Sequence, residues 1–76
     1  MIEFKVKINN IEDVKKFVAA VSAFRYEIDL ISGKYAVDAK SVMGIFSLDT
    51  SKVLTMVAHT DDTAELEAAL SDFIIN

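Results

Sequence analysis

The stretch IEFKVKI, residues 2–8, decides the fold, because its side chains alternate without a break. Its apolar members are Ile2, Phe4, Val6 and Ile8, and every position between them carries a charged side chain. A period of two predicts a strand with one face in the core and one face in water. A strand of this kind needs a cover on one face only, which favours an antiparallel sheet with one bare face.

The segment after this strand changes to a helical period. Glu12 and Asp13 in its first turn and Arg25 near its far end suit the helix dipole, and Asn10 stands where a capping residue belongs. The spacing predicts a helix with one buried stripe. The apolar residues of the stripe are Ile11, Val14, Phe17, Val18, Val21 and Phe24.

Five further elements follow along the chain. Alternation on both sides of Ser32-Gly33 predicts a hairpin, since glycine permits the positive φ of a tight turn. Residues 41 to about 48 are too densely apolar for alternation and predict a short helix capped by Ser41. A β-rich run, residues 53–58, precedes Asp62 and Glu65, which are spaced as a capping box. The last apolar stripe comprises Leu66, Ala69, Leu70, Phe73 and Ile74.

The predicted order of elements is therefore β-α-β-β-α-β-α. This order indicates the α+β class, as an open-faced β-sandwich whose four-stranded antiparallel sheet is covered on one face by helices. The chain has no proline and only two glycines, so nothing resembles a linker. We expect one domain over residues 1–76.

Composition excludes several classes of function. The net charge is −4, so a phosphate backbone would be repelled on average, and we expect no nucleic-acid partner. No run is long enough to span a bilayer or resembles an export signal, and cysteine is absent, so we expect a cytoplasmic protein without a membrane partner. One histidine and no glycine-rich phosphate loop leave little for a metal site, a cofactor or a catalytic centre, and we predict no enzyme.

One motif resembles a known family. Residues 40–48, KSVMGIFSL, resemble the K-S-I-M-G-[VLI]-M-S-L signature of HPr, the histidine-containing phosphocarrier of the bacterial sugar phosphotransferase system. The resemblance extends weakly over nearly the whole chain and implies the HPr-like fold. The unchanged positions are Lys40, Ser41, Met43, Gly44, Ser47 and Leu48.

The same resemblance indicates that a functional residue is missing. HPr proteins carry phosphate on the histidine of an H-A-R-P-A motif at the start of the first long helix, and counting back without gaps places residues 10–14, NIEDV, on that motif. Asn10 then takes the position of the phosphohistidine, and a carboxamide cannot form it. Glu12 and Asp13 would repel a phosphate where arginine attracts it. The pattern is similar to the catabolite-repression HPr-like protein, although the arginine and proline are also absent here.

Ser41 has two interpretations. The resemblance implies a regulatory phosphorylation site, with HPr kinase/phosphorylase or a catabolite control regulator as partners and Val42, Met43 and Phe46 as the docking patch. Alternatively, Ser41 only caps the helix, and Val42 and Phe46 close the core. Met43 is expected to be the exposed member in either case.

The favoured hypothesis is a regulatory or adaptor protein of HPr type that acts through the Ser41 region. One alternative is a phosphocarrier that uses His59, although we expect this residue at the end of the last strand, facing solvent or hydrogen-bonded. Another is an HPr fold reused for unrelated protein binding. The sequence leaves the oligomeric state open.

Overall fold

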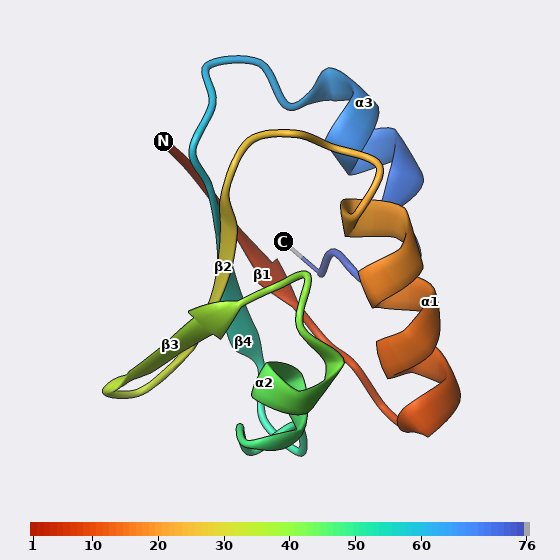
Figure 1. Ribbon diagram of the computed structural model, residues 1–76, viewed down its shortest axis with the longest axis vertical. Coiled ribbons are helices and arrows are strands. Elements are labelled where there is room, and N and C mark those ends of the chain that lie inside the picture. The colour runs from red at the N-terminus through yellow and green to blue at the C-terminus, as the bar shows by residue number, and fades with distance from the viewer. Residues whose placement is uncertain (76) are drawn as a thin grey trace.

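The computed structural model describes residues 1–75 and confirms the predicted order of elements (Figure 1). The strands are β1 (Ile2–Val6), β2 (Ile28–Ser32), β3 (Tyr35–Asp38) and β4 (Leu54–Ala58). The helices are α1 (Ile11–Val21), α2 (Val42–Phe46) and α3 (Ala64–Ala69).

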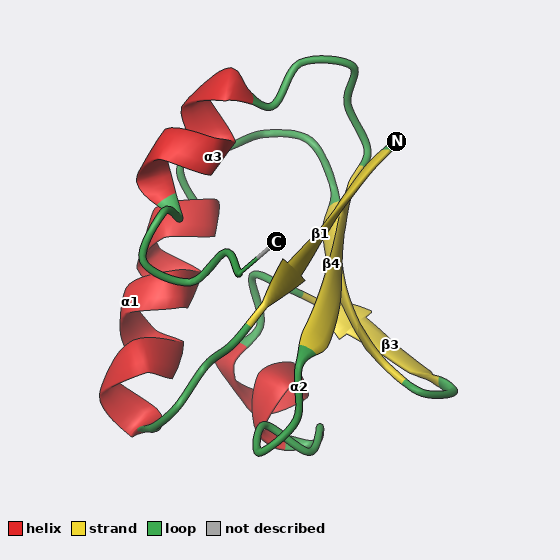
Figure 2. Ribbon diagram, turned by 180° about the vertical axis from the view of Figure 1, so that it is seen from behind, coloured by secondary structure: helices red, strands yellow, loops and turns green. Residues whose placement is uncertain are grey.

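The four strands form one antiparallel sheet in the order β1-β4-β2-β3. Strand β4 pairs with β1 on one side, where Phe4 faces Met56, and with β2 on the other, where Leu30 faces the same Met56. Figure 2 shows α1 and α3 together on one side of the sheet, while the opposite face is bare. The predicted open-faced sandwich is therefore confirmed.

The core lies between the sheet and the helices, as the alternation in β1 predicts. Phe4 and Val6 point inward, whereas Glu3 and Lys5 between them are exposed. Phe17 of α1 meets Phe73 edge to face, with ring centroids 5.6 Å apart. The remaining fully buried large side chains are Ile8, Val21, Ile28, Leu30, Ile45, Leu54, Met56, Leu66 and Leu70.

Helix α1 ends earlier than its apolar stripe predicts. It stops at Val21, so Phe24 and Arg25 lie in the connection to β2 and no basic residue stands in the last turn. The ammonium of Lys40 donates to the carbonyl oxygens of Phe24 (2.6 Å) and Tyr26 (2.9 Å). These bonds give the carbonyl oxygens of Phe24 and Tyr26 a partner that they would otherwise find in a longer helix. A contact from a residue distant in sequence thus favours the end of α1 at Val21.

The last apolar stripe also forms less helix than predicted. Helix α3 ends at Ala69, and the following residues turn toward the outer edge of β1. Ile74 forms a bridge with Val6, and the N–H of Ile75 donates to the carbonyl of Lys5 at 2.9 Å. Backbone pairing with an open sheet edge thus replaces the last predicted helical turns.

The capping box predicted from Asp62 and Glu65 is wrong. Helix α3 begins one residue later, with Thr63 as the N-cap, and the Thr63 side chain forms no capping bond to a backbone N–H of the helix. The hydroxyl of Thr63 instead donates to the carboxylate of Glu67 at 2.9 Å, and Oδ1 of Asp62 accepts from the N–H of Ala64 at 3.0 Å. The Asp62 side chain therefore fixes the turn that leads into α3.

Candidate functional site

The N-terminus of α1 is closed by the protein's own side chains. Asn10 has the extended backbone of an N-cap, and its Oδ1 accepts from the N–H of Asp13 at 2.9 Å. Oδ2 of Asp13 accepts in return from the N–H of Asn9 at 3.1 Å. The predicted cap is confirmed, and with Glu12 beside Asp13 this helix start presents carboxylates to solvent.

The buried stripe of α1 begins one turn later than predicted. Ile11, which heads the predicted stripe, is 59% exposed, whereas Val14 is buried. The surface around Asn10 therefore has both an apolar and an acidic component.

Ser41 caps α2, as predicted. Its Oγ accepts from the N–H of Gly44 at 3.0 Å, and its carbonyl oxygen accepts from the N–H of Ile45 at 3.0 Å. The residue is half-buried, and no acid stands in the first turn of α2. Lys40, just before it, is held by its bonds to the α1–β2 connection. The segment is therefore fixed at Lys40 by these bonds and at Ser41 by the cap.

Gly44 lets α2 pack closely against its neighbours. A Cβ at this position would lie 3.2 Å from the Oγ of Ser41 and 3.2 Å from the Cβ of Val37 on β3. Any side chain here would press on the capping hydroxyl and on the strand. The glycine in the middle of the motif thus has a packing reason that the sequence interpretation missed.

The three residues of the predicted docking patch differ in exposure. Met43 is 79% exposed and Phe46 is 45% exposed, whereas Val42 is half-buried and packs against the core. Ile45, between them in sequence, is fully buried and anchors α2. Val42 thus has the core role of the second interpretation, and the apolar surface beside Ser41 comes from Met43 and Phe46.

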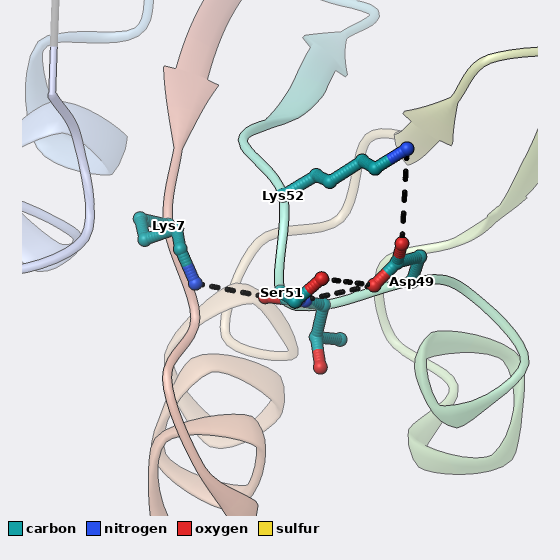
Figure 3. A network of polar contacts seen from close by, with 5 residues as sticks. Lys7, Asp49, Ser51 and Lys52 are labelled. Carbon is teal, nitrogen blue, oxygen red and sulfur yellow. Dashed lines mark hydrogen bonds and ion pairs between the residues drawn. The ribbon is translucent and has the colours of Figure 1, made fainter.

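The loop after α2 is held by a polar network that the sequence interpretation also missed (Figure 3). The ammonium of Lys7 donates to the carbonyl oxygen of Thr50 at 2.8 Å, and Oδ1 of Asp49 accepts from the N–H of Ser51 at 3.1 Å and from its hydroxyl. The bonds from the Ser51 hydroxyl and N–H lower the pKa of Asp49, and Lys52 and Lys7 contribute further. An Asp whose side chain bonds the backbone two residues later is typical of such a turn. Asp49 and Ser51 have this spacing in the sequence, which could have predicted the turn.

His59 follows the last residue of β4, as predicted. Its Nε2 lies 2.9 Å from Oδ2 of Asp29, and its N–H donates to the carbonyl oxygen of Glu27 at 2.9 Å. Since β4 runs antiparallel to β1 and Ala58 faces Ile2, His59 lies at the opposite end of the sheet from Asn10. The structure does not bring these two residues together.

Neither a metal centre nor a membrane span is found in the part of the chain that the structure describes. Residues 1–75 contain no group of three or more His, Cys, Asp or Glu side chains placed to hold a metal ion. The helices formed by these residues also lack the length and apolar character that crossing a membrane requires.

The sheet order and the helices on one face define a small open-faced α+β protein. The family model PTS-HPr, described as the PTS HPr component phosphorylation site, matches residues 2–76. The chain therefore belongs to the HPr family of the phosphotransferase system, whose members are phosphocarriers that interact with other proteins of that system.

One solved structure supports this assignment, and a second shares the fold. The crystal structure of HPr-C-His from Thermoanaerobacter tengcongensis has a TM-score of 0.79 and 34% sequence identity, over 95% of this chain and 89% of that chain. The phosphocarrier protein HPr from Bacillus anthracis str. Ames shares the fold, with a TM-score of 0.73 and 24% identity over 95% of both chains. The search of curated proteins found no match.

Proposed function

We propose that this protein is a cytoplasmic regulatory or adaptor member of the HPr family that contacts partner proteins through the surface around Ser41. In this proposal Asn10 occupies the place of the phosphohistidine, and the chain passes no phosphate to sugars. The observation that carries the proposal is the start of α1, where Asn10 and Asp13 close the helix N-terminus.

The chemistry at Asn10 argues against a phosphoryl acceptor. An acceptor needs a nucleophilic side chain, such as the imidazole nitrogen of histidine. The amide nitrogen of asparagine is delocalised into its carbonyl group and is a poor nucleophile. An incoming phosphate would also meet Glu12 and Asp13, whose charges have the same sign, while the Asp13 N–H is already bonded.

The surroundings of Ser41 support the regulatory role. Its hydroxyl is half-buried beside two exposed apolar side chains, Met43 and Phe46, and the first turn of α2 carries no acid. A phosphate on this hydroxyl adds a charge of about −1.5 to −2 at pH 7 to the surface that, in this proposal, a partner binds. Flexible methionine suits a contact surface that meets differently shaped partners.

The direct test is phosphorylation of the purified chain by HPr kinase/phosphorylase with ATP, read by mass spectrometry. We expect one phosphate on Ser41, none in Ser41→Ala, and the wild-type level in Ser47→Ala, which removes an exposed hydroxyl at the other end of the same helix. Absence of phosphate, together with no binding to the kinase or to a catabolite control regulator, would remove the support for this proposal.

The alternative is a phosphocarrier that uses His59. The hydrogen bond that Oδ2 of Asp29 accepts from the His59 ring orients this imidazole, as a carboxylate does for a catalytic imidazole. Incubation with phosphoenolpyruvate and the first enzyme of the phosphotransferase system separates the two roles. The regulatory proposal expects no acid-labile phosphate. An acid-labile phosphate that disappears in His59→Gln would establish the alternative.

A further inference from the structure

Two connections at one end of the molecule enclose a hollow that the proposed function does not use. The α1–β2 connection supplies Phe24 and Tyr26, and the β4–α3 region supplies Asp62 and Glu65. Figure 1 shows both connections side by side above the sheet, next to the start of α3. The hollow they line has a volume of about 220 Å³.

The aromatic side of this hollow is held in place. The rings of Phe24 and Tyr26 lie with centroids 5.7 Å apart and planes inclined by 43°. Both side chains are partly buried and pack against the core, so their orientation costs little to maintain. The faces of aromatic rings are electron-rich and attract cations.

The opposite side of the hollow is acidic, and no basic side chain among residues 1–75 forms an ion pair with it. Within residues 1–75 the ion pairs are Lys52 with Asp49 and His59 with Asp29, so neither Asp62 nor Glu65 has a cationic partner there. Partial burial raises the pKa of the Tyr26 phenol, and Glu65 and Asp62 raise it further. The charges of both carboxylates are therefore close enough to influence the Tyr26 side chain across the hollow.

Lys40 contacts the backbone of this aromatic pair, but its ammonium does not line the hollow. Its ammonium donates to the backbone carbonyls of Phe24 and Tyr26. Its side chain lines a different hollow, together with Glu27, Ile28, Asp29 and Asp38. The space between the rings and the two carboxylates is not lined by a basic residue.

We propose that this hollow binds the guanidinium or ammonium head of an organic cation, with the head group between the Phe24–Tyr26 rings and the carboxylates of Asp62 and Glu65. The volume lies below the roughly 300–1,000 Å³ of pockets for drug-sized ligands, so a head group fits better than a whole cofactor. A planar guanidinium suits the site best, since it stacks on aromatic faces and also pairs with carboxylates. The net charge of −4 favours approach of a cation.

The test is a titration of the full-length, ¹⁵N-labelled chain with methylguanidinium, followed by amide chemical shifts. We expect saturable shifts with a millimolar dissociation constant, centred on the amides of residues 24–26 and 62–65. Methylurea, a neutral molecule of similar shape, is the matched control and is expected to produce no saturable shift. Absence of saturation with methylguanidinium, or equal shifts with methylurea, overturns the proposal.

Variants locate the site without disturbing the fold. Asp62→Asn removes the charge but keeps the side-chain oxygen that accepts from Ala64, and Glu65→Gln removes the second charge. Each is expected to weaken binding about threefold or more, given the usual worth of an exposed ion pair. Asp72→Asn, the same charge change at an exposed position outside the hollow, is expected to leave the dissociation constant unchanged. Equal weakening by all three variants would show that net charge alone attracts the cation and would overturn the proposal.

The aromatic contribution has its own test. Phe24→Leu keeps apolar volume but removes the ring face, and we expect weaker binding with retained amide dispersion. An unchanged dissociation constant in a folded Phe24→Leu chain overturns the assignment of the rings. A capped arginine tripeptide then distinguishes the sources of the cation: tighter binding than methylguanidinium assigns the site to a partner's side chain, and equal binding assigns it to free small cations.

Discussion

Replacing Ser41 by alanine tests whether its hydroxyl caps the start of α2. The change removes the oxygen that accepts from the N–H of Gly44 at 3.0 Å. A lost N-cap typically costs about 0.5–2 kcal/mol of folding free energy. Burial of Ile45 holds α2 in place, so we expect the cost of one cap, about 1 kcal/mol, and not the loss of the helix.

Aspartate at the same position separates capping from the hydroxyl itself. Ser41→Asp supplies an oxygen acceptor of equal capping rank and a charge that suits the positive end of the helix. We therefore expect Ser41→Asp to remain close to the wild type in stability. Ser71→Ala, which removes a hydroxyl from the exposed turn after α3, is the control for a general serine effect.

Thermal unfolding followed by circular dichroism, with urea titration for the free energy, gives the measurement. For a chain of this size, about 1 kcal/mol corresponds to a fall in Tm of about 4–8 °C. If Ser41→Ala unfolds with the midpoint of the wild type, or if Ser41→Asp is as unstable as Ser41→Ala, the hydroxyl is not the functional cap and the start of α2 is placed wrongly.

Three further predictions follow from single contacts. Asn10→Ala is expected to lower the free energy of unfolding by about 0.5–2 kcal/mol in urea titration, and an unchanged value would contradict the cap. Gly44→Ala gains about 1 kcal/mol of helix propensity, but crowding against Val37 costs about 1–3 kcal/mol, so we expect no gain in Tm. The carboxyl of Asp49 is expected to titrate below its ordinary pKa of 3.8 by ¹³C NMR and to move upward in Ser51→Ala. Because folding lowers the pKa of Asp49, its carboxylate stabilises the fold at a pH above the pKa of Asp49 in the unfolded chain. This contribution to the free energy of unfolding is lost as the pH falls through the lower pKa of the folded chain. A titration midpoint for Asp49 that does not change in Ser51→Ala would refute the hydrogen bond.

Local patterns predict most of this fold. The alternation in residues 2–8 gives the strand and its inward face, and Asn10 and Ser41 mark two helix starts correctly. The helix ends depend on contacts between distant segments. Lys40 reaches back to the α1–β2 connection, and Ile75 pairs with β1, so periodicity alone could not show where α1 and α3 stop.

Some features of the candidate site could be predicted from the sequence and others could not, because the latter depend on contacts between distant segments. The exposure of Met43 follows from its place on a short helix, but the half-burial of Val42 depends on how α2 meets the sheet. Gly44 has a role only because Val37 and the hydroxyl of Ser41 approach it from two other directions. The hollow between Phe24 and Glu65 is equally invisible in sequence, since 41 positions separate the two residues.

The two helix starts support the proposal that this chain no longer transfers phosphate but keeps the fold. Asparagine is among the best N-cap residues, so Asn10 stabilises α1, and the acids in its first turn suit the helix dipole. The same features that favour the helix are unfavourable for a phosphate, because its charge meets Glu12 and Asp13. At α2 the cap is a neutral hydroxyl without acidic neighbours in the first turn, so capping and phosphorylation do not exclude each other there. Helix stability and phosphate binding thus oppose each other at Asn10 and are compatible at Ser41, which is why we propose the regulatory role for α2 and not for α1.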